Sequence, residues 1–451
     1  MPPEGSCPPY ALEAGQEQQG PEDVTPSLPA QGKRIEWTDL DRIGTYLPPE
    51  IWARRDVFFH EGMRLEIGPC HRRYDAPPFF RKSTRDNAGR AQLDEDGNLV
   101  GYRGDGLPFS PDSILDDAPD AGQRWAWNYR YRYMGAGFRG DFRIIHADLR
   151  KGTGDRYEGH LAWVPLHGVP GLPEQRPNGF RFAAAGRFEK PAIARGVAWR
   201  QLSPSDADGN YKRSDDLFVW IPEQRKVRRA PPQSVEGLFM PSYQRGQMGD
   251  ESTLSLPGNS GSTRVPDSSL AVVEHQRRGF VGLWVRPNAY RFHLVRVQDV
   301  LAPINSNRFG FPSDPNRSYG PSGLSLATDR WELRRAVVLR GERRDPERKL
   351  SSATIYVDAL TQQPLYFVTR GSRELIQEVG ILMGRYSADD PLQPSWEGSG
   401  NGSGVILPVA ASFWLAGRIG WLRESFELRA DPPNAESFKD MTTTIWLRGG
   451  R

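Results

Sequence analysis

Five aromatic residues occupy every second position of one short segment, and this row restricts the fold more than any other feature of the chain. The rings belong to Trp125, Trp127, Tyr129, Tyr131 and Tyr133. Side chains two positions apart lie on the same face of a β-strand, whereas a helix would scatter them around its circumference. The spacing therefore predicts a strand that carries all five rings on one face.

The residues between the rings face the other way under the same prediction. They include Arg130 and Arg132, which would project from the opposite face of the strand. We therefore expect neither arginine to bind the head group of a ligand that lies against the rings. The rings themselves have two interpretations. They fill an ordinary core, or some of them line a cavity for an acyl chain or another apolar ligand.

Proline and glycine punctuate the whole chain. The 39 Pro and 47 Gly among 451 residues argue against long helices and favour short strands joined by turns. Hairpins are predicted at 217–229 and 353–369. The predicted strands are 138–148, 159–165, 194–202, 216–222, 225–229, 280–285, 290–297, 330–340, 353–358, 364–370 and 419–429. This pattern predicts a mainly β fold, a large and strongly curved antiparallel sheet (a half-barrel) with a few covering helices.

Composition divides the chain into three parts. Residues 1–35 are rich in Pro, Gln, Glu and Gly and have no apolar pattern, which predicts disorder. Residues 36–124 are expected to form a helical and loop-rich cover, with helices near 50–58 and 83–91. Residues 125–451 are the predicted β domain. Within it, 246–270 and 389–404 are rich in Gly, Ser and Pro and are predicted to be long exposed loops.

The chain lacks the motifs of the common enzyme classes. Its seven histidines form no HxH or HExxH pair, and its two cysteines have no zinc-binding spacing. It has no GxSxG nucleophile elbow, phosphate loop or dinucleotide fingerprint. Adjacent acids such as Asp215 and Asp216 would point to opposite faces of a strand, so they would not act on one substrate. The sequence thus predicts a non-enzymatic protein without catalytic residues, metal or cofactor.

Charge and hydropathy narrow the choice of partners. A net charge of +3 gives no nucleic-acid footprint, and the excess of arginine over lysine is interpreted as the mark of a GC-rich genome. No stretch approaches the ~20 apolar residues of a membrane helix. The N-terminus lacks the basic start and apolar run of a signal peptide, so the protein stays inside the cell or the reading frame begins downstream of its true start. A disulfide between Cys7 and Cys70 and two free thiols are both compatible with the sequence.

Several longer motifs point to a known family. The sequence GLPF at 106–109 precedes the acidic run 116–122, and the aromatic row follows it directly. These motifs resemble the bacterial family DUF1329, whose members are described as outer-membrane lipoprotein-sorting-like. Further similar segments lie at 49–68, 81–102, 219–231 and 331–366. The resemblance implies a curved antiparallel half-barrel similar to the periplasmic lipoprotein carriers. It also implies export, and it brings no catalytic residues with it.

The sequence therefore favours a cell-envelope protein, in the periplasm or at the periphery of the outer membrane. It would bind or carry a hydrophobic small molecule, a lipid or a lipoprotein acyl chain, with no cofactor and no nucleic acid. The expected ligand-binding residues are Trp125, Trp127, Tyr129, Tyr131, Tyr133, Phe218 and Trp220. An alternative hypothesis is an accessory subunit that docks on an outer-membrane protein or envelope transporter through its long loops. A hydrolase is a third hypothesis, which no motif supports.

Overall fold

The fold of the described residues is mainly β, with few helices. The computed structural model describes residues 28–148, 153–170, 172, 178–222, 225–230, 237–240, 283–344, 350–390, 403–416, 420–431, 435–443 and 446–447. Within these residues, fifteen strands form one large sheet and two form a small one. The large sheet runs from β1 to β10 without closing into a barrel. The predicted fold class is confirmed, with the difference that one strand pair is parallel and the sheet is therefore mixed.

The large sheet has two halves that meet where β17 pairs with β5. The first half contains β5 (Phe138–Asp148), β6 (Thr153–Pro165), β7 (Phe180–Lys190), β8 (Ala198–Pro204), β9 (Asp216–Ile221) and β10 (Lys226–Arg229). The second half contains β12 (Arg330–Arg343), β13 (Leu350–Asp358), β14 (Pro364–Gly371), β15 (Ile376–Tyr386), β16 (Ile406–Leu415) and β17 (Gly420–Ala430). Antiparallel pairing of β17 with β5 along their full lengths makes the two halves continuous.

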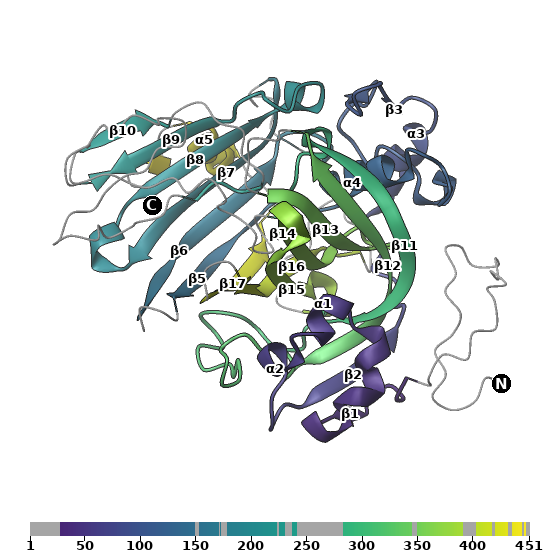
Figure 1. The fold of residues 1–451 in the computed structure, drawn as a ribbon. Helices are drawn as coiled ribbons and strands as arrows, with labels where there is room; N and C mark the ends of the chain where they lie inside the picture. The colour runs from purple at the N-terminus through teal and green to yellow at the C-terminus, as the bar shows by residue number, and fades with distance from the viewer. Residues whose placement is uncertain are drawn as a thin grey trace.

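Three further strands complete the second half. Strand β11 (Tyr290–Ala302) pairs antiparallel with β12, and β2 (Leu65–Cys70) pairs in parallel with the start of β12. Strand β1 (Arg34–Ile35) extends β2. Figure 1 shows β11 as a long curved strand around the rolled second half, while β5 to β10 fan out on the other side. The small sheet consists of β3 (Gln92–Leu93) and β4 (Leu99–Val100).

Most of the predicted strands and both predicted hairpins are present. Strands β9 and β10 form the first hairpin, and β13 and β14 form the second. Strand β5 has the predicted bounds at both ends. Strands β7, β15 and β16 and the two-residue strands β1, β3 and β4 were not predicted. The predicted strand at 280–285 is wrong over its described residues, because 283–285 have no regular structure.

Short helices cover the sheet at the N-terminal side. They are η1 (Trp37–Tyr46), α1 (Pro49–Trp52), α2 (Arg55–Phe58), α3 (Pro78–Asp86) and η2 (Pro111–Ser113). Helix α1 begins at Pro49, as proline in the first turn predicts. Helix α3 begins at Pro78 rather than at residue 83. Later helical turns are η3 (Ala192–Ala194), η4 (Ser205–Asp208), η6 (Pro287–Ala289), η7 (Ser372–Glu374), η8 (Ser387–Asp389) and α5 (Ala435–Thr442).

Several predicted segments fall partly or wholly outside the described residues. Of the predicted disordered segment 1–35, only 28–35 are described, and Ile35 there is a buried residue of β1. The predicted loop 246–270 lies outside the described residues, as do 391–402 of the loop 389–404. Cys70 is disulfide-bonded, and residue 7 lies outside the described range. The predicted domain boundary at residue 125 falls inside a helix.

That helix corrects the strongest expectation from the sequence. Residues 121–130 form α4 (Ala121–Arg130), so the strand predicted at Trp125–Tyr133 is wrong. Two residues in a helix turn by about 200°, so the rings fall on opposite sides. Such a helix is stable where both sides are covered, and here even Ala126 and Asn128, between the rings, are 0% exposed. The sequence alternates aromatic with non-aromatic residues, and this alternation does not separate buried from exposed positions.

Helix α4 is held by polar bonds on several sides. The Asp120 carboxylate accepts a hydrogen bond from Arg124 Nε at 2.8 Å, four residues later, at the start of the helix. Asn128 bonds both the N–H and the C=O of Phe109, in the GLPF segment, at 3.0 and 2.8 Å. The indole of Trp127 donates to the C=O of Gly97 at 3.0 Å. Gly122 brings the helix so close to β11 that a Cβ there would collide with its backbone.

Candidate ligand-binding site

A cavity lies where two apolar clusters of the core meet. One cluster fills the second half of the sheet and its N-terminal cover, and Tyr102 and Tyr131 pack against it. The other covers β5 to β9 and includes Trp163, Phe182 and Trp284. The cavity encloses about 690 Å³ of space free of atoms, including its open mouth. Its wall consists of Phe80, Tyr102, Gly104, Gly106, Arg130, Tyr131, Arg132, Tyr133, Met134, Gly135, Trp163, Pro165, His167, Gly168, Val169, Arg181, Phe182 and Trp284.

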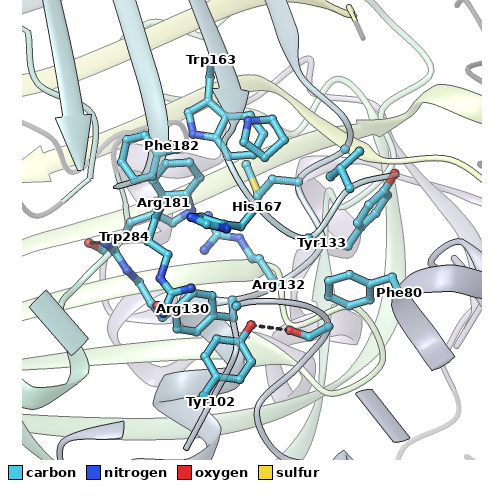
Figure 2. Close-up of a pocket in the computed structure, with 18 residues that line it drawn as sticks. Phe80, Tyr102, Arg130, Arg132, Tyr133, Trp163, His167, Arg181, Phe182 and Trp284 are labelled. Atoms are coloured by element: carbon cyan, nitrogen blue, oxygen red, sulfur yellow. Dashed lines mark hydrogen bonds between the residues drawn. The ribbon is translucent and has the colours of Figure 1, made fainter. Parts of the chain in front are cut away.

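One wall is a cluster of three aromatic rings from three separate segments. The end of β6 supplies Trp163 and the start of β7 supplies Phe182, and their centroids lie 6.1 Å apart. Trp284 stands against both, with centroid distances of 5.6 Å to Trp163 and 5.1 Å to Phe182. All three side chains are buried. Figure 2 shows them on one side of the cavity.

The opposite wall comes from the segment after α4 and from α3. The ring of Tyr133 packs against that of Phe80 with centroids 5.2 Å apart. A second, smaller cavity of about 350 Å³ shares Phe80 and Tyr133 as wall residues and extends toward Gln363 and Tyr386. These two rings therefore stand between the two cavities.

Arginine side chains supply most of the polar surface of the larger cavity. In Figure 2, Arg130, Arg132 and Arg181 lie between the Trp163–Phe182 wall and Tyr102. The Arg181 guanidinium pairs with the carboxylate of Asp208 at 2.5 Å, and the hydroxyl of Tyr131 donates to the same carboxylate at 2.5 Å. Burial is the main cause that raises the pKa of Tyr131, so this hydroxyl stays protonated and donating.

The other two arginines bond to neutral groups. Arg132 donates from Nε to the side-chain oxygen of Gln363 at 3.0 Å and from Nη1 to the C=O of Tyr129 at 2.9 Å. Its guanidinium carbon lies 4.7 Å from the ring centroid of Tyr129. Burial lowers the pKa of Arg132 to about 10, so it remains charged at neutral pH. Arg130 donates from Nη1 to the C=O of Trp284 at 3.2 Å, and burial lowers its pKa as well.

The predicted site residues separate into two groups. Tyr131 and Tyr133 line the cavity, whereas Trp125, Trp127 and Tyr129 are buried in the core and do not. Phe218 and Trp220 also lie outside the cavity wall. They occupy the half-buried face of β9, where the Arg200 guanidinium stacks on Phe218 with 4.8 Å to the ring centroid.

The predicted placement of the two arginines on the face opposite the rings was wrong. Arg130 and Arg132 line the same cavity as Tyr131 and Tyr133. The helix ends at Arg130, so the residues that follow no longer alternate between the faces of a regular element. Sequence reasoning also missed Phe80, Trp163, Arg181, Phe182 and Trp284, which come from segments far apart in the chain and share no local pattern.

Family comparison agrees with the motifs seen in the sequence. Residues 50–244 match the model of a family described as "Protein of unknown function (DUF1329)". Over this segment the chain is similar to that family. This segment contains every wall residue of the cavity except Trp284. The chain matches no curated protein.

Several solved structures resemble the chain. A putative outer membrane lipoprotein-sorting protein domain from Vibrio parahaemolyticus has 11% identity and a TM-score of 0.40, covering 74% of this chain and 100% of its own. A DUF1329 family protein from Desulfovibrio piger has 12% identity and a TM-score of 0.40, covering 73% and 99%. A LolA superfamily protein from Nitrosomonas europaea has 13% identity and a TM-score of 0.32, covering 74% and 99%.

Two kinds of site are absent from the described residues. No group of three or more His, Cys, Asp or Glu side chains there is placed to hold a metal ion. No helix in the described part of the chain has the length and apolar character needed to span a bilayer.

Proposed function

We propose that this protein is a non-enzymatic binding protein that holds a hydrophobic small molecule or lipid chain in the cavity between its two apolar clusters. The proposal rests on the wall of this cavity, which carries the rings of Phe80, Tyr133, Trp163, Phe182 and Trp284. Inside it, about 100 Å³ is accessible to the centres of water-sized molecules, several times what one water needs. Protein interiors otherwise hold few voids larger than a water molecule. A concave site lined mostly by apolar and aromatic side chains, with a few polar groups, is typical of a ligand site.

Apolar contact supplies the affinity in this proposal. Burying one methylene group contributes about 0.8 kcal/mol, so six methylenes against these rings contribute about 5 kcal/mol before the entropic cost of association. The rings are already packed against one another, so little side-chain freedom is lost when a ligand enters. The cavity therefore suits one chain or one small molecule rather than a folded partner.

We place the protein in the cell envelope as part of this proposal. The support is that Cys70 is disulfide-bonded, and disulfides persist in oxidising compartments such as the periplasm. Fractionation of cells of the source organism, with immunodetection of the untagged protein, is expected to find it in the periplasmic or membrane fraction. Recovery in the cytosol alone would contradict the placement. The alternative of a docking subunit stays a prediction, because its loops lie largely outside the described residues.

Filling the cavity is expected to weaken the binding of an apolar ligand. Val169 lies in the wall, and Val169→Trp would place a large ring in the open space. We expect the wild type to bind Nile red, a neutral apolar dye, with a saturable rise in fluorescence. Val169→Trp should weaken this binding at least tenfold, which corresponds to about 1.4 kcal/mol.

The matched control adds the same ring far from the cavity wall. Leu115 is 68% exposed, so Leu115→Trp should leave dye affinity and the melting temperature unchanged. Equal dye affinity for both variants and the wild type would show that the dye binds elsewhere and would reject the cavity as the ligand site.

A further inference from the structure

The wall of the cavity holds four buried hydrogen-bond donors that find no acceptor among the described residues. They are Nη2 of Arg132, Nε of Arg181, Nε1 of Trp163 and Nε1 of Trp284. None of the buried acceptor atoms of the wall residues is left without a donor. A buried donor without an acceptor costs free energy, and native proteins keep few of them. Four such atoms line one cavity and all are donors, which points to a ligand that accepts hydrogen bonds.

Three of these donors belong to residues that contact one another. The guanidinium carbon of Arg132 lies 5.5 Å from the ring centroid of Trp284, whose centroid is 5.6 Å from that of Trp163. Arg132 and Trp284 are each 3% exposed and Trp163 is 6% exposed. The donors therefore lie deep in the wall, where a ligand rather than bulk solvent would satisfy them.

The cavity also carries positive charge that its own carboxylates do not balance. Asp208 is occupied by Arg181. Among the described residues, neither Arg130 nor Arg132 has a carboxylate within 4.0 Å. A charged guanidinium taken out of water without an anion is costly, and a bound anion would offset that cost.

Two other acids lie close to the cavity, and neither reaches these arginines. The carboxylate of Asp215 pairs with Arg286 at 2.6 Å. Asp105 is half-buried on the loop between Gly104 and Gly106 and lies against Gly168, at the edge of the wall. The charge near Arg132 is therefore positive.

We propose that the cavity binds an amphiphile with an oxyanion head, a carboxylate or a phosphate, which Arg132 and the indole N–H groups of Trp163 and Trp284 hold. The apolar body of the ligand lies against Phe182, Tyr133 and the neighbouring rings. This inference rests on the proposed function and names the class of ligand. Charge-assisted bonds from a guanidinium to an oxyanion are about twice as strong as neutral ones, and they fix the orientation of the head.

Four twelve-carbon probes with different heads test this inference. Dodecanoate, dodecyl phosphate, dodecanol and dodecyltrimethylammonium are titrated into the full chain by calorimetry below their micelle concentrations. We expect one or both anions to bind at least tenfold more tightly than dodecanol, and the ammonium to bind more weakly than dodecanol. Comparison of the two anions distinguishes a carboxylate from a phosphate ligand. Inorganic phosphate and acetate, which lack the apolar body, should not bind detectably.

Variants separate the head-group site from the apolar site. Arg132→Met keeps the length of the side chain and removes its charge, so it should weaken anion binding at least tenfold while dodecanol affinity stays within threefold. Trp284→Phe keeps an aromatic ring, smaller than the indole, and removes the N–H, so it should weaken anion binding several-fold more than it weakens dodecanol binding. This second variant preserves the test if Arg132→Met fails to fold. Arg103→Met removes an exposed arginine beside the cavity and should change neither affinity.

The outcomes distinguish this inference from the function on which it rests. If dodecanol binds as tightly as both anions, the oxyanion site is wrong and the apolar cavity stands. If Arg132→Met and Trp284→Phe both keep the wild-type preference for anions, these donors do not hold the head and the inference fails. If none of the four probes binds, the proposed function itself fails.

Discussion

Replacing Arg334 with methionine is expected to destabilise the protein by about 3–5 kcal/mol. The Arg334 side chain on β12 is fully buried, and its Nε and Nη2 bond the two carboxylate oxygens of Asp358 at 2.9 and 3.0 Å. Its Nη1 donates to the C=O of Arg72 at 2.7 Å and lies 3.6 Å from the carboxylate of Glu332. Methionine has a similar length but no charge. It would leave two buried carboxylates without their cation, and this uncompensated charge is the source of the loss.

The control is an exposed arginine on the same strand. Arg340 pairs with Glu374 at 2.6 Å, and both side chains are in contact with solvent. Exposed pairs of this kind contribute about 0–1 kcal/mol, so Arg340→Met should have little effect. Denaturant unfolding followed by tryptophan fluorescence measures both variants. If the unfolding midpoints of the two variants agree, the buried network does not contribute as its geometry predicts.

The hairpins were predictable because their signal is local. A strand, a short turn and a second strand follow one another in sequence at β9–β10 and β13–β14, so pairing needs no distant information. Strand β7 was missed because its centre is Ala-Ala-Ala-Gly, which has low β propensity. Its residues are buried because β6 and β8 flank them, and that environment depends on the whole sheet.

The aromatic row shows why a clear period can mislead. A period of two identifies a strand only when it separates a buried face from an exposed one. Between the rings of α4 lie Ala126 and Asn128, both fully buried, so these intervening positions do not form an exposed face. The small residues Ala121 and Gly122 at the start of α4, where the helix meets β11, were the local signal for close helix packing. They mark one close contact of the helix with β11, which the rings do not.

The candidate site was predictable only in part for the same reason. Tyr131 and Tyr133 line the cavity, although the strand from which they were placed does not exist. Trp163 and Trp284 come from segments more than 100 residues apart, and only the folded chain brings them to 5.6 Å. The buried donors of this wall have no sequence signature, because an indole N–H finds or lacks its acceptor only in the folded state.

The stability of the protein is expected to fall as the pH drops from 6.5 to 4, and His71 is the main cause. The His71 side chain is buried beside β12. Burial lowers the pKa of His71 to about 4, and the positive charges of Arg334 and Arg335 contribute to the same shift. In the unfolded chain the pKa of histidine is about 6.5. The folded protein therefore resists protonation of a group that the unfolded chain protonates readily.

This difference in pKa between the folded and unfolded states determines the direction of the pH effect on stability. Above pH 6.5 the imidazole is neutral in both states and the full stability is present. As the pH falls, the unfolded state takes up the proton first, so the free energy of unfolding decreases by about 3 kcal/mol until the pH reaches 4. Burial alone would raise the pKa of Glu158, but its bonds to Lys190, Arg156 and Arg143 lower this pKa to about 2. Glu158 therefore loses its contribution to stability mainly below about pH 4.5. Most of the effect of His71 is thus measurable between pH 6.5 and 4.5.

His71→Asn is expected to remove most of this pH dependence. The asparagine side chain does not titrate, and asparagine tolerates the backbone φ of 48° at this position better than most residues. The control His293→Asn changes an exposed histidine on β11 and should keep the wild-type slope. A smaller decrease in stability at low pH should remain in His71→Asn, because burial also lowers the pKa of half-buried His60. Asp299, 4.0 Å from the His71 imidazole, acts in the opposite direction because burial raises its pKa. If the midpoint of denaturant unfolding of His71→Asn falls between pH 6.5 and 4.5 as steeply as that of the wild type, another group controls the acid sensitivity.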